Sequence, residues 1–381
     1  ESARKAIAAA RTLLQTPHQI VLGAARYAID RTTLEKAVAF ETTNGVVRLE
    51  LQRPPIAAFV HRLFGRAETQ PVNASFAPGD GSGVRIVPSR EGHVVDVDAV
   101  RRTLSDHPDQ RDVKVQIASR QPAFTTADAQ KLGVTDQVGE FTTPYAPGEP
   151  RVTNIQAAAA ILDGTILKPG ESFSLDRRIG PRTLDRGFVM APMIDSDRLR
   201  DAVGGGISQV ATTMFNAAWY AGLDLVQHQP HAFYISRYPE GREATISEGG
   251  PDLVFKNDWE APLVILVEAG DDHITVRFFS RSLGRRVVDG ADEPHDFTDA
   301  QEKRIPNSQL APGEEQVIQH GGQQGFTISV WRKVYRGDRL VHDDRYTWTY
   351  IPEDTIIEVG PTPEPPPDTT GGTGTGGGTD T

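Results

Sequence analysis

The sequence predicts an α+β chain with several domains. Three observations lead to this prediction: a strand–helix–strand unit occurs twice near the N-terminus, an uncharged helix follows a glycine triplet in the middle, and alternating strands fill the segment near the C-terminus. The length of 381 residues suffices for two or three domains. We expect a duplicated α+β region at 1–138, a central α+β domain around a buried helix at 139–285, a small all-β module at 286–360 and a disordered tail at 361–381.

The composition argues against several classes of function. The formal net charge of −11 disfavours nucleic-acid binding, because phosphates require a basic surface. No apolar run approaches the roughly 18 residues that indicate a membrane span. The absence of cysteine excludes disulfides, thiol nucleophiles and cysteine-based zinc sites. Because the chain starts at Glu1 without an initiator methionine, we interpret it as a processed or trimmed fragment from which any export signal or anchor has been lost.

Residues 27–51 and 93–117 carry an internal repeat in which equivalent positions are 66 residues apart. Each copy has a strand, then an aspartate (Asp30 or Asp96), then apolar residues at helical spacing, then alternating apolar residues. The aspartate suits a helix N-cap, because its carboxylate accepts amide protons of the first turn. We interpret the repeat as a duplicated recognition or spacer module, with chance similarity as the alternative.

Local patterns predict the remaining elements of the N-terminal and central regions. We expect an amphipathic helix over 54–66, a helix starting near Thr125 and a Pro- and Gly-rich linker over 142–150. An alanine-rich helix over 154–162 should end at Asp163-Gly164, where glycine suits a left-handed C-cap. The strands expected in the central region cover 166–174 (with a turn), 253–255, 263–267 and 274–279.

The C-terminal segment predicts antiparallel strands and then a tail. Apolar residues alternate over 325–335 and 346–350, and 356–360 supplies a closing strand. Residues 361–381 contain only Pro, Thr, Gly, Asp and Glu, so nothing apolar offsets the entropy of ordering them. The tail is either a spacer or an ordinary frayed terminus.

The central helix carries the first candidate site. It follows Gly204-Gly205-Gly206, and its apolar residues from Ile207 onward fall on one face. No charged residue occurs from 204 to 222, which predicts a buried helix whose polar stripe needs hydrogen-bond partners. The glycines permit positive φ and close backbone approach, and their amides could hold an anion or oxyanion. The alternative is a tight turn packed against a strand.

The segment after this helix supplies a candidate base. His231 could act on Ser208 as a general base, with Glu243 or Asp252 orienting the imidazole; the alternative is a structural histidine. His228 lies three residues away, but a proline lies between them and no third ligand follows, so we predict no metal and no cofactor. The candidate catalytic residues are Ser208, His231 and Glu243. The candidate ligand-binding residues are Gly204, Gly205, Gly206, Gln209, Thr212, Asn216, His228, Tyr234, Arg237 and Arg242, of which the two arginines could bind a carboxylate.

The central block resembles the VanW family. The matching stretches are 154–158, 163–165, 168–174, 179–183, 187–188, 204–217, 230–234 and 252–257. The repeated N-terminal region resembles the peptidoglycan-binding domain that often precedes VanW, and the C-terminal strands resemble a G5 domain of bacterial surface proteins. The resemblance implies an exported, envelope-associated bacterial protein but no particular reaction. Many relatives have cysteine at the position of Ser208, and a hydroxyl is far less acidic than a thiol.

We therefore expect an extracytoplasmic protein, on the cell wall or anchored at the cell surface, that binds or organises peptidoglycan. We expect no nucleic-acid partner and no membrane span within this fragment. The first alternative is an enzyme acting on cell-wall peptide or glycan, with Ser208 as nucleophile, His231 as base and the amides of Gly205 and Gly206 as an oxyanion site. The second is a spacer without a ligand. The site assignment requires that the helix start and His231 border one cavity.

Overall fold

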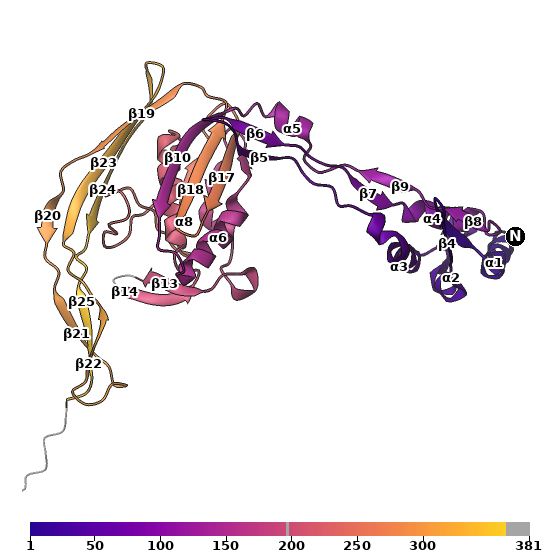
Figure 1. The fold of residues 1–381 in the computed structure, drawn as a ribbon, viewed down its shortest axis with the longest axis horizontal. Helices are drawn as coiled ribbons and strands as arrows, with labels where there is room; N and C mark the ends of the chain where they lie inside the picture. Colours follow the sequence, from indigo (N-terminus) through magenta and orange to yellow (C-terminus); the bar gives the residue numbers. More distant parts are fainter. Residues whose placement is uncertain (196–197, 363–381) are drawn as a thin grey trace, which may run out of the picture. The chain divides into compact units, whose positions relative to one another are not determined.

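The computed structural model describes residues 1–195 and 198–362, so nearly all of the predicted disordered tail lies outside the described residues (Figure 1). The chain is an α+β multidomain protein, as predicted. Contacts divide it into two compact units, 1–77 with 85–132 and 78–84 with 133–381, and each unit has its own hydrophobic core. The predicted domain boundaries near 138, 285 and 360 stay predictions. None of the described helices has the length and apolarity that a membrane crossing requires.

The first unit packs short helices around small sheets. Its helices are α1 (Ser2–Gln15), α2 (Arg31–Ala37), α3 (Arg53–Phe64), α4 (Val97–Asp106) and α5 (Thr126–Lys131). The strands in and bordering it are β1 (Gln19–Leu22), β2 (Ala25–Ala28), β3 (Val38–Thr43), β4 (Val46–Leu51), β5 (Ser75–Pro78), β6 (Val84–Val87), β7 (Gly92–Val95), β8 (Asp112–Lys114) and β9 (Ile117–Arg120). Strand β1 pairs with β2 in antiparallel and with β8 in parallel orientation, and β7 pairs with β9.

Both predicted aspartate caps form in this unit. Asp30 Oδ1 accepts the amide of Thr33 at 2.8 Å at the start of α2, and Asp96 Oδ1 accepts the amide of Ala99 at 2.8 Å at the start of α4. The strand–cap–helix order is therefore confirmed in both copies. After α4, however, the expected single strand is divided between β8 and β9, which belong to different sheets. The duplication itself stays a prediction.

The central part of the second unit consists of three helices and short sheets. The helices are α6 (Pro150–Leu162), α7 (Leu175–Ile179) and α8 (Ile207–Tyr220). Its largest sheet has the order β10 (Asp136–Pro144), β18 (His273–Ser280), β17 (Leu263–Ala269), β11 (Thr165–Leu167). A second sheet joins β12 (Ser172–Ser174), β16 (Val254–Lys256) and β15 (Asp224–Gln227), and β13 (Met190–Asp195) pairs with β14 (Arg198–Val203).

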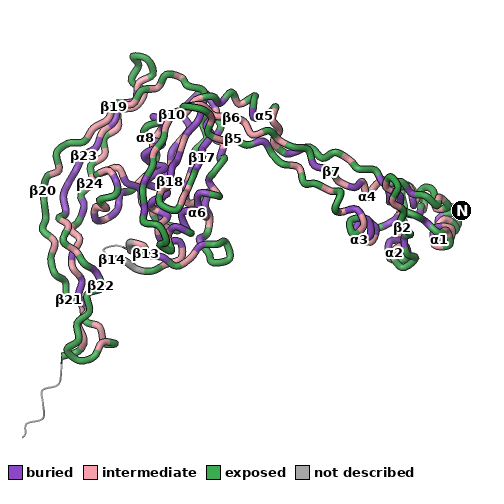
Figure 2. The backbone as a smooth tube through the Cα atoms, viewed as in Figure 1, coloured by how far each residue is buried: buried purple, intermediate pink, exposed green. Residues whose placement is uncertain are grey.

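Helix α8 is the buried centre of this unit, as predicted. It packs against β10, β18 and α6, and nearly all of its residues are buried (Figure 2). The predicted linker over 142–150 is wrong at its start: residues 142–144 form the end of β10 and pair with β18. Thr143 is buried there, and its hydroxyl lies 2.7 Å from that of Thr213 on α8. Packing on the helix outweighs the local proline signal, because β10 is an edge strand of its sheet and edge strands tolerate proline.

The C-terminal strands form the predicted all-β segment. They are β19 (Arg285–Ala291), β20 (His295–Thr298), β21 (Glu302–Pro306), β22 (Glu315–Gln319), β23 (Gly325–Arg336), β24 (Arg339–Tyr350) and β25 (Thr355–Val359). In the first sheet, β23 forms a long hairpin with β24 and also pairs with β19 and β20. In the second sheet, β25 lies between β21 and β22. Val330 of β23 belongs to the same core as α8, so this hairpin is part of the second unit rather than an appendage.

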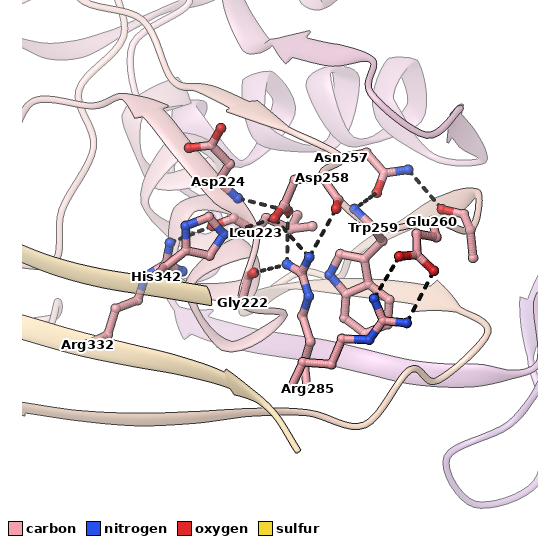
Figure 3. A network of polar contacts seen from close by, with 12 residues as sticks. Gly222, Leu223, Asp224, Asn257, Asp258, Trp259, Glu260, Arg285, Arg332 and His342 are labelled. Atoms are coloured by element: carbon pink, nitrogen blue, oxygen red, sulfur yellow. Dashed lines mark hydrogen bonds and ion pairs between the residues drawn. The ribbon is translucent and has the colours of Figure 1, made fainter. Parts of the chain in front are cut away.

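A polar network joins these strands to the end of α8 (Figure 3). Arg332 of β23 is fully buried and donates to the carbonyl oxygen of Trp219 at 2.9 Å, and also to that of Leu223. Arg285 and His342 both bind the Asp258 carboxylate, at 2.8 and 2.9 Å. The positive guanidinium group of Arg332 thus satisfies carbonyl oxygens at and just beyond the negative end of the helix.

Candidate ligand-binding site

The glycine triplet forms a tight turn before α8. Gly204 and Gly206 have φ values of +87° and +94°, which side-chain-bearing residues rarely adopt. At Gly205 a Cβ atom would lie 2.2 Å from the carbonyl oxygen of Ala191 on β13. The Gly205 amide donates to the carbonyl oxygen of Ala202 at 3.2 Å, so this member of the predicted oxyanion pair is engaged within the turn. The structure therefore favours the packed-turn interpretation for Gly204 and Gly205.

A cavity of about 660 Å³ opens beside this turn. It is lined by Gly206, Ser208 and Gln209 at the start of α8 and by His231 and other residues of the segment after β15. The remaining lining residues come from four stretches, 149–151, 192–193, 229–238 and 245–251: Glu149, Pro150, Arg151, Pro192, Met193, Gln229, Pro230, Ala232, Ile235, Arg237, Tyr238, Thr245, Ile246, Ser247 and Pro251. The start of α8 and His231 thus border one cavity.

His231 and Glu243 form a buried pair at the cavity wall. His231 Nδ1 lies 2.5 Å from Glu243 Oε2, and the two residues are 4% and 0% exposed. The other carboxylate oxygen of Glu243 accepts the hydroxyl of Tyr350 from β24 at 3.0 Å. Trp348, also on β24, donates from its indole nitrogen to the carbonyl oxygen of His231 at 2.9 Å. The C-terminal hairpin therefore holds the imidazole in place.

Ser208 lies on the same cavity but is not bonded to the histidine. Its hydroxyl oxygen accepts the amide of Ile246 over a long 3.4 Å, and no hydrogen bond joins it to His231 within the described residues. The rest of the polar stripe binds backbone: Thr212 accepts the amide of Ala244 at 3.1 Å, and Asn216 donates to the carbonyl oxygen of Arg242 at 2.9 Å. These two side chains fasten the 242–246 segment to α8 and do not line the cavity.

Three other predicted ligand-binding residues lie away from the cavity. His228 stacks on Phe215 with ring centroids 4.3 Å apart, and burial, followed by the nearby charge of Arg332, lowers the pKa of His228 to about 4. Tyr234 donates to the carbonyl oxygen of Tyr238 at 2.8 Å. Arg242 pairs with Asp289 at 2.8 Å and stacks on aromatic rings. In this structure these side chains hold the segment after β15 in place.

Sequence reasoning missed Arg151 and Tyr238. Arg151, one residue after the proline that opens α6, donates to Gln209 Oε1 at 2.8 Å and pairs with Glu149 at 2.8 Å. Burial and then the charge of Arg237 lower the pKa of Arg151. Tyr238 stacks on the His231 ring with centroids 5.8 Å apart. A proline followed by a charged residue is a helix-start signal for position 150, but nothing local indicates that Arg151 meets α8.

Comparisons with known proteins agree with this organisation. A model described as "VanW like protein" matches residues 150–279, and one described as "Putative peptidoglycan binding domain" matches residues 24–112. The chain is 31% identical over 226 residues to the uncharacterized protein YoaR of Bacillus subtilis (strain 168), which covers 58% of this chain and 73% of that protein. It is 30% identical over 139 residues to the vancomycin B-type resistance protein VanW of Enterococcus faecalis (strain ATCC 700802 / V583), which covers 35% of this chain and 50% of that protein.

Solved structures similar to parts of the chain include a G5 domain and an L,D-transpeptidase. The G5 domain of an IgA1 protease is 24% identical, covers 21% of this chain and 94% of that structure, and gives a TM-score of 0.14. An L,D-transpeptidase of Enterococcus faecium with a C442S substitution is 10% identical, covers 38% of this chain and 70% of that structure, and gives a TM-score of 0.19.

The VanW-like match and the cavity coincide in sequence. Every lining residue except Glu149 falls within the matched residues 150–279. The match to YoaR extends further, to 226 residues and almost three quarters of that protein. On these two grounds the chain belongs to the family of VanW-like proteins.

Proposed function

We propose that this chain binds peptidoglycan outside the cytoplasm, on the cell wall or anchored at the cell surface. Its family membership makes it a cell-envelope-associated protein. The observation that carries the finer proposal is the peptidoglycan-binding match over residues 24–112, in the unit that precedes the cavity-bearing one.

The cavity supports the same proposal by its size and lining. A volume of about 660 Å³ is in the range of pockets that hold small organic ligands. Apolar walls with a few convergent polar groups suit a peptide or a sugar derivative better than a bare ion. A wall polymer contains both peptides and sugars in one ligand, so the two units could bind different parts of one strand of polymer.

Co-sedimentation with purified peptidoglycan sacculi tests this proposal. We expect the full chain to pellet with sacculi and to stay in the supernatant with cellulose, an insoluble polysaccharide without peptides. We expect Ser208→Ala to pellet like the unchanged chain, because binding does not require a nucleophile. Equal pelleting with sacculi and cellulose, or no pelleting with sacculi, would contradict the proposal.

An enzyme acting on wall peptide or glycan is the second candidate. The observation that favours it is the buried His231–Glu243 pair on the cavity that Ser208 also lines. In such an enzyme Ser208 would be the nucleophile, His231 the general base and Glu243 the group that orients the imidazole. The missing hydrogen bond between Ser208 and His231 weighs against it, although such bonds often tighten only with substrate bound.

Mass spectrometry of muropeptides incubated with the protein separates the two candidates. For an enzyme we expect new product masses, lost in Ser208→Ala and reduced at least about 100-fold in His231→Gln. Unchanged muropeptides, from a preparation that still pellets with sacculi, would leave binding as the function and exclude this mechanism.

A further inference from the structure

Two arginine side chains converge on the cavity from different segments. Arg151 comes from the start of α6, is 14% exposed and is oriented by Gln209. Arg237 comes from the segment after β15, is exposed, and makes no ion pair among the described residues; its guanidinium group lies 5.9 Å from the ring centroid of Tyr238. Glu149 forms an ion pair with Arg151 at 2.8 Å, whereas no acidic side chain in the described part of the chain forms one with Arg237. Arg237 therefore brings to the cavity a positive charge that is in no ion pair among the described residues, in a chain whose net charge is −11.

His231 provides a second, independent observation. The residue is only 4% exposed, and Nδ1 is bound to Glu243. The opposite ring nitrogen, Nε2, has no hydrogen-bond partner among the described residues, and the ring lines the cavity. Because this ring lines the cavity and only Nδ1 is bonded, Nε2 is available to a ligand or to water.

The electrostatics of the arginines indicate the charge of that ligand. The charge of Arg237 contributes to the lowered pKa of Arg151, after burial, so the two guanidinium groups are close enough to repel each other. An anion between them would offset the repulsion and would meet the positive end of α8, where Gly206 borders the cavity. A guanidinium group matches the planar fork of a carboxylate with two parallel hydrogen bonds.

The walls indicate what the anion is attached to. Pro150, Met193, Pro230, Ile235, Ile246 and Pro251 surround the charged groups with apolar surface. Such walls favour a carboxylate carried by small apolar groups, as in a short acylated peptide, over inorganic phosphate, which has no apolar part to bury.

We propose that the cavity is a carboxylate-recognition site for a short acylated peptide, with Arg237 and Arg151 binding the carboxylate and His231 Nε2 binding a neighbouring polar atom. The source of the peptide rests on the proposed function: the peptides of peptidoglycan carry carboxylates on small residues. Recognition of the carboxylate itself does not depend on whether the chain adheres to the intact polymer.

Isothermal titration calorimetry of the full chain with three probes tests this inference. The probes are a soluble disaccharide-tetrapeptide with free carboxylates, the same muropeptide with its carboxylates converted to methylamides, and inorganic phosphate. We expect the free acid to bind at least about tenfold more tightly than the methylamide, since hydrogen bonds to charged groups are individually strong. We expect phosphate to compete weakly or not at all.

Substitutions assign the effect to the cavity. Arg237→Gln should weaken binding of the free acid about tenfold or more and leave binding of the methylamide unchanged, because it removes one charged donor from an exposed side chain. Arg178→Gln is the matched control: it removes the same charge from an exposed arginine of α7 that does not line the cavity, and should change neither affinity. Arg151→Lys keeps the charge but loses the fork, and should weaken the free acid selectively.

The outcomes separate this inference from the proposed function. Equal affinity for acid and methylamide, or equal effects of Arg237→Gln and Arg178→Gln, would overturn the inference even if the chain pellets with sacculi. Tight phosphate binding that displaces the free acid would overturn the peptide assignment. Acid-selective binding that depends on Arg237, in a chain that fails to pellet, would support the inference and contradict polymer binding.

Discussion

Glu243 is the buried acid on which the candidate site depends. It is fully buried, and each of its oxygens has a partner, His231 Nδ1 or the Tyr350 hydroxyl. Burial, and then the charge of Glu243, raise the pKa of Tyr350, so its hydroxyl stays a neutral donor. Removing one partner would leave a carboxylate oxygen unsatisfied away from water, which is costly.

Tyr350→Phe should therefore destabilise the second unit. The substitution removes the hydrogen bond to Glu243 and the acceptor for the Gly241 amide at 2.9 Å. We expect a loss of about 1–3 kcal/mol in the free energy of unfolding, measured by urea titration. Tyr335→Phe on the same hairpin is the control, because no hydrogen bond of its hydroxyl is found among the described residues, and it should change little. Equal stability of the two variants would mean that the Tyr350 bond contributes nothing.

The glycine turn gives a second prediction at this scale. Gly205→Ala would place a methyl group 2.2 Å from the carbonyl oxygen of Ala191, so β13 or the turn must shift. We expect a destabilisation of about 1–3 kcal/mol, together with weaker muropeptide binding because the start of α8 moves. Gly270→Ala is the control: the new Cβ would lie 3.4 Å from the nearest atom, an ordinary contact. A Gly205→Ala protein as stable as Gly270→Ala would contradict the close packing of this turn.

The hairpin β23–β24 is the element that links the C-terminal strands to the helix. Arg332 and Val330 of β23 reach α8 and its core, while Trp348 and Tyr350 of β24 hold the cavity segment. His342 of β24 joins Arg285 of β19 on the Asp258 carboxylate. The hairpin thus contacts both the end of α8 and the segment that lines the cavity, although it lies outside the residues matched to VanW-like proteins.

The Asp258 contacts predict an acid-dependent loss of stability. Burial alone would raise the pKa of Asp258, but hydrogen bonds from His342 and Arg285 outweigh it and lower the pKa to about 2, from a usual value of 3.8. A lowered folded-state pKa gives a stabilisation that is complete above about pH 4 and is lost as the pH falls through about 2. The stability advantage of the unchanged chain over Asp258→Asn should therefore shrink by about 2 kcal/mol between pH 5 and pH 2.

Urea titrations at several pH values measure this difference. The control is Asp338→Asn, which removes an exposed carboxylate from the turn of the same hairpin. The difference in free energy of unfolding between Asp338→Asn and the unchanged chain should stay nearly constant over this pH range. A constant difference for Asp258→Asn as well would show that the contacts of Asp258 do not contribute to stability.

At the scale of the molecule, each of the two compact units has its own main hydrophobic core in the described part of the chain, and these two cores share no residue. Leu13, Leu51 and Val100 belong to the first core, and Ile155, Phe215 and Phe278 to the second. Compact units with separate cores generally unfold as separate cooperative units, whereas a single core would unfold in one step.

Calorimetry should therefore show two unfolding transitions that respond to different substitutions. Asp96→Ala removes the N-cap of α4 and should lower the midpoint temperature of one transition, by an amount corresponding to a loss of about 1 kcal/mol in the free energy of unfolding. Arg332→Met leaves the α8 carbonyl oxygens and Asp344 without their buried partner and should lower the other, by about 3–5 kcal/mol. A single transition shifted by both substitutions would contradict two independent units.

Much of the fold could be predicted from local patterns. The aspartate caps of α2 and α4, the end of α6 at Asp163-Gly164 and the buried uncharged α8 each depend on residues a few positions apart. That Gly206, Ser208 and His231 border one cavity was a condition of the site assignment, which local patterns could not decide. Cap chemistry and apolar periodicity operate over one or two turns of chain, which is the range that such patterns report.

Tertiary structure decided the rest of the site. Arg151 and Arg237 line the same cavity although they are 86 positions apart in sequence. Tyr350 donates a hydrogen bond to Glu243 from 107 positions away. Residues 142–144 pair in a sheet and do not form the predicted linker. The sequence by itself determined the fold class, the main helices and the family resemblance, because each depends on patterns of residues that are close together in sequence. Which side chains share a cavity, and which hairpin holds them there, was decided by packing between distant segments, since burial is set by the whole unit and leaves no signature in any one stretch of chain.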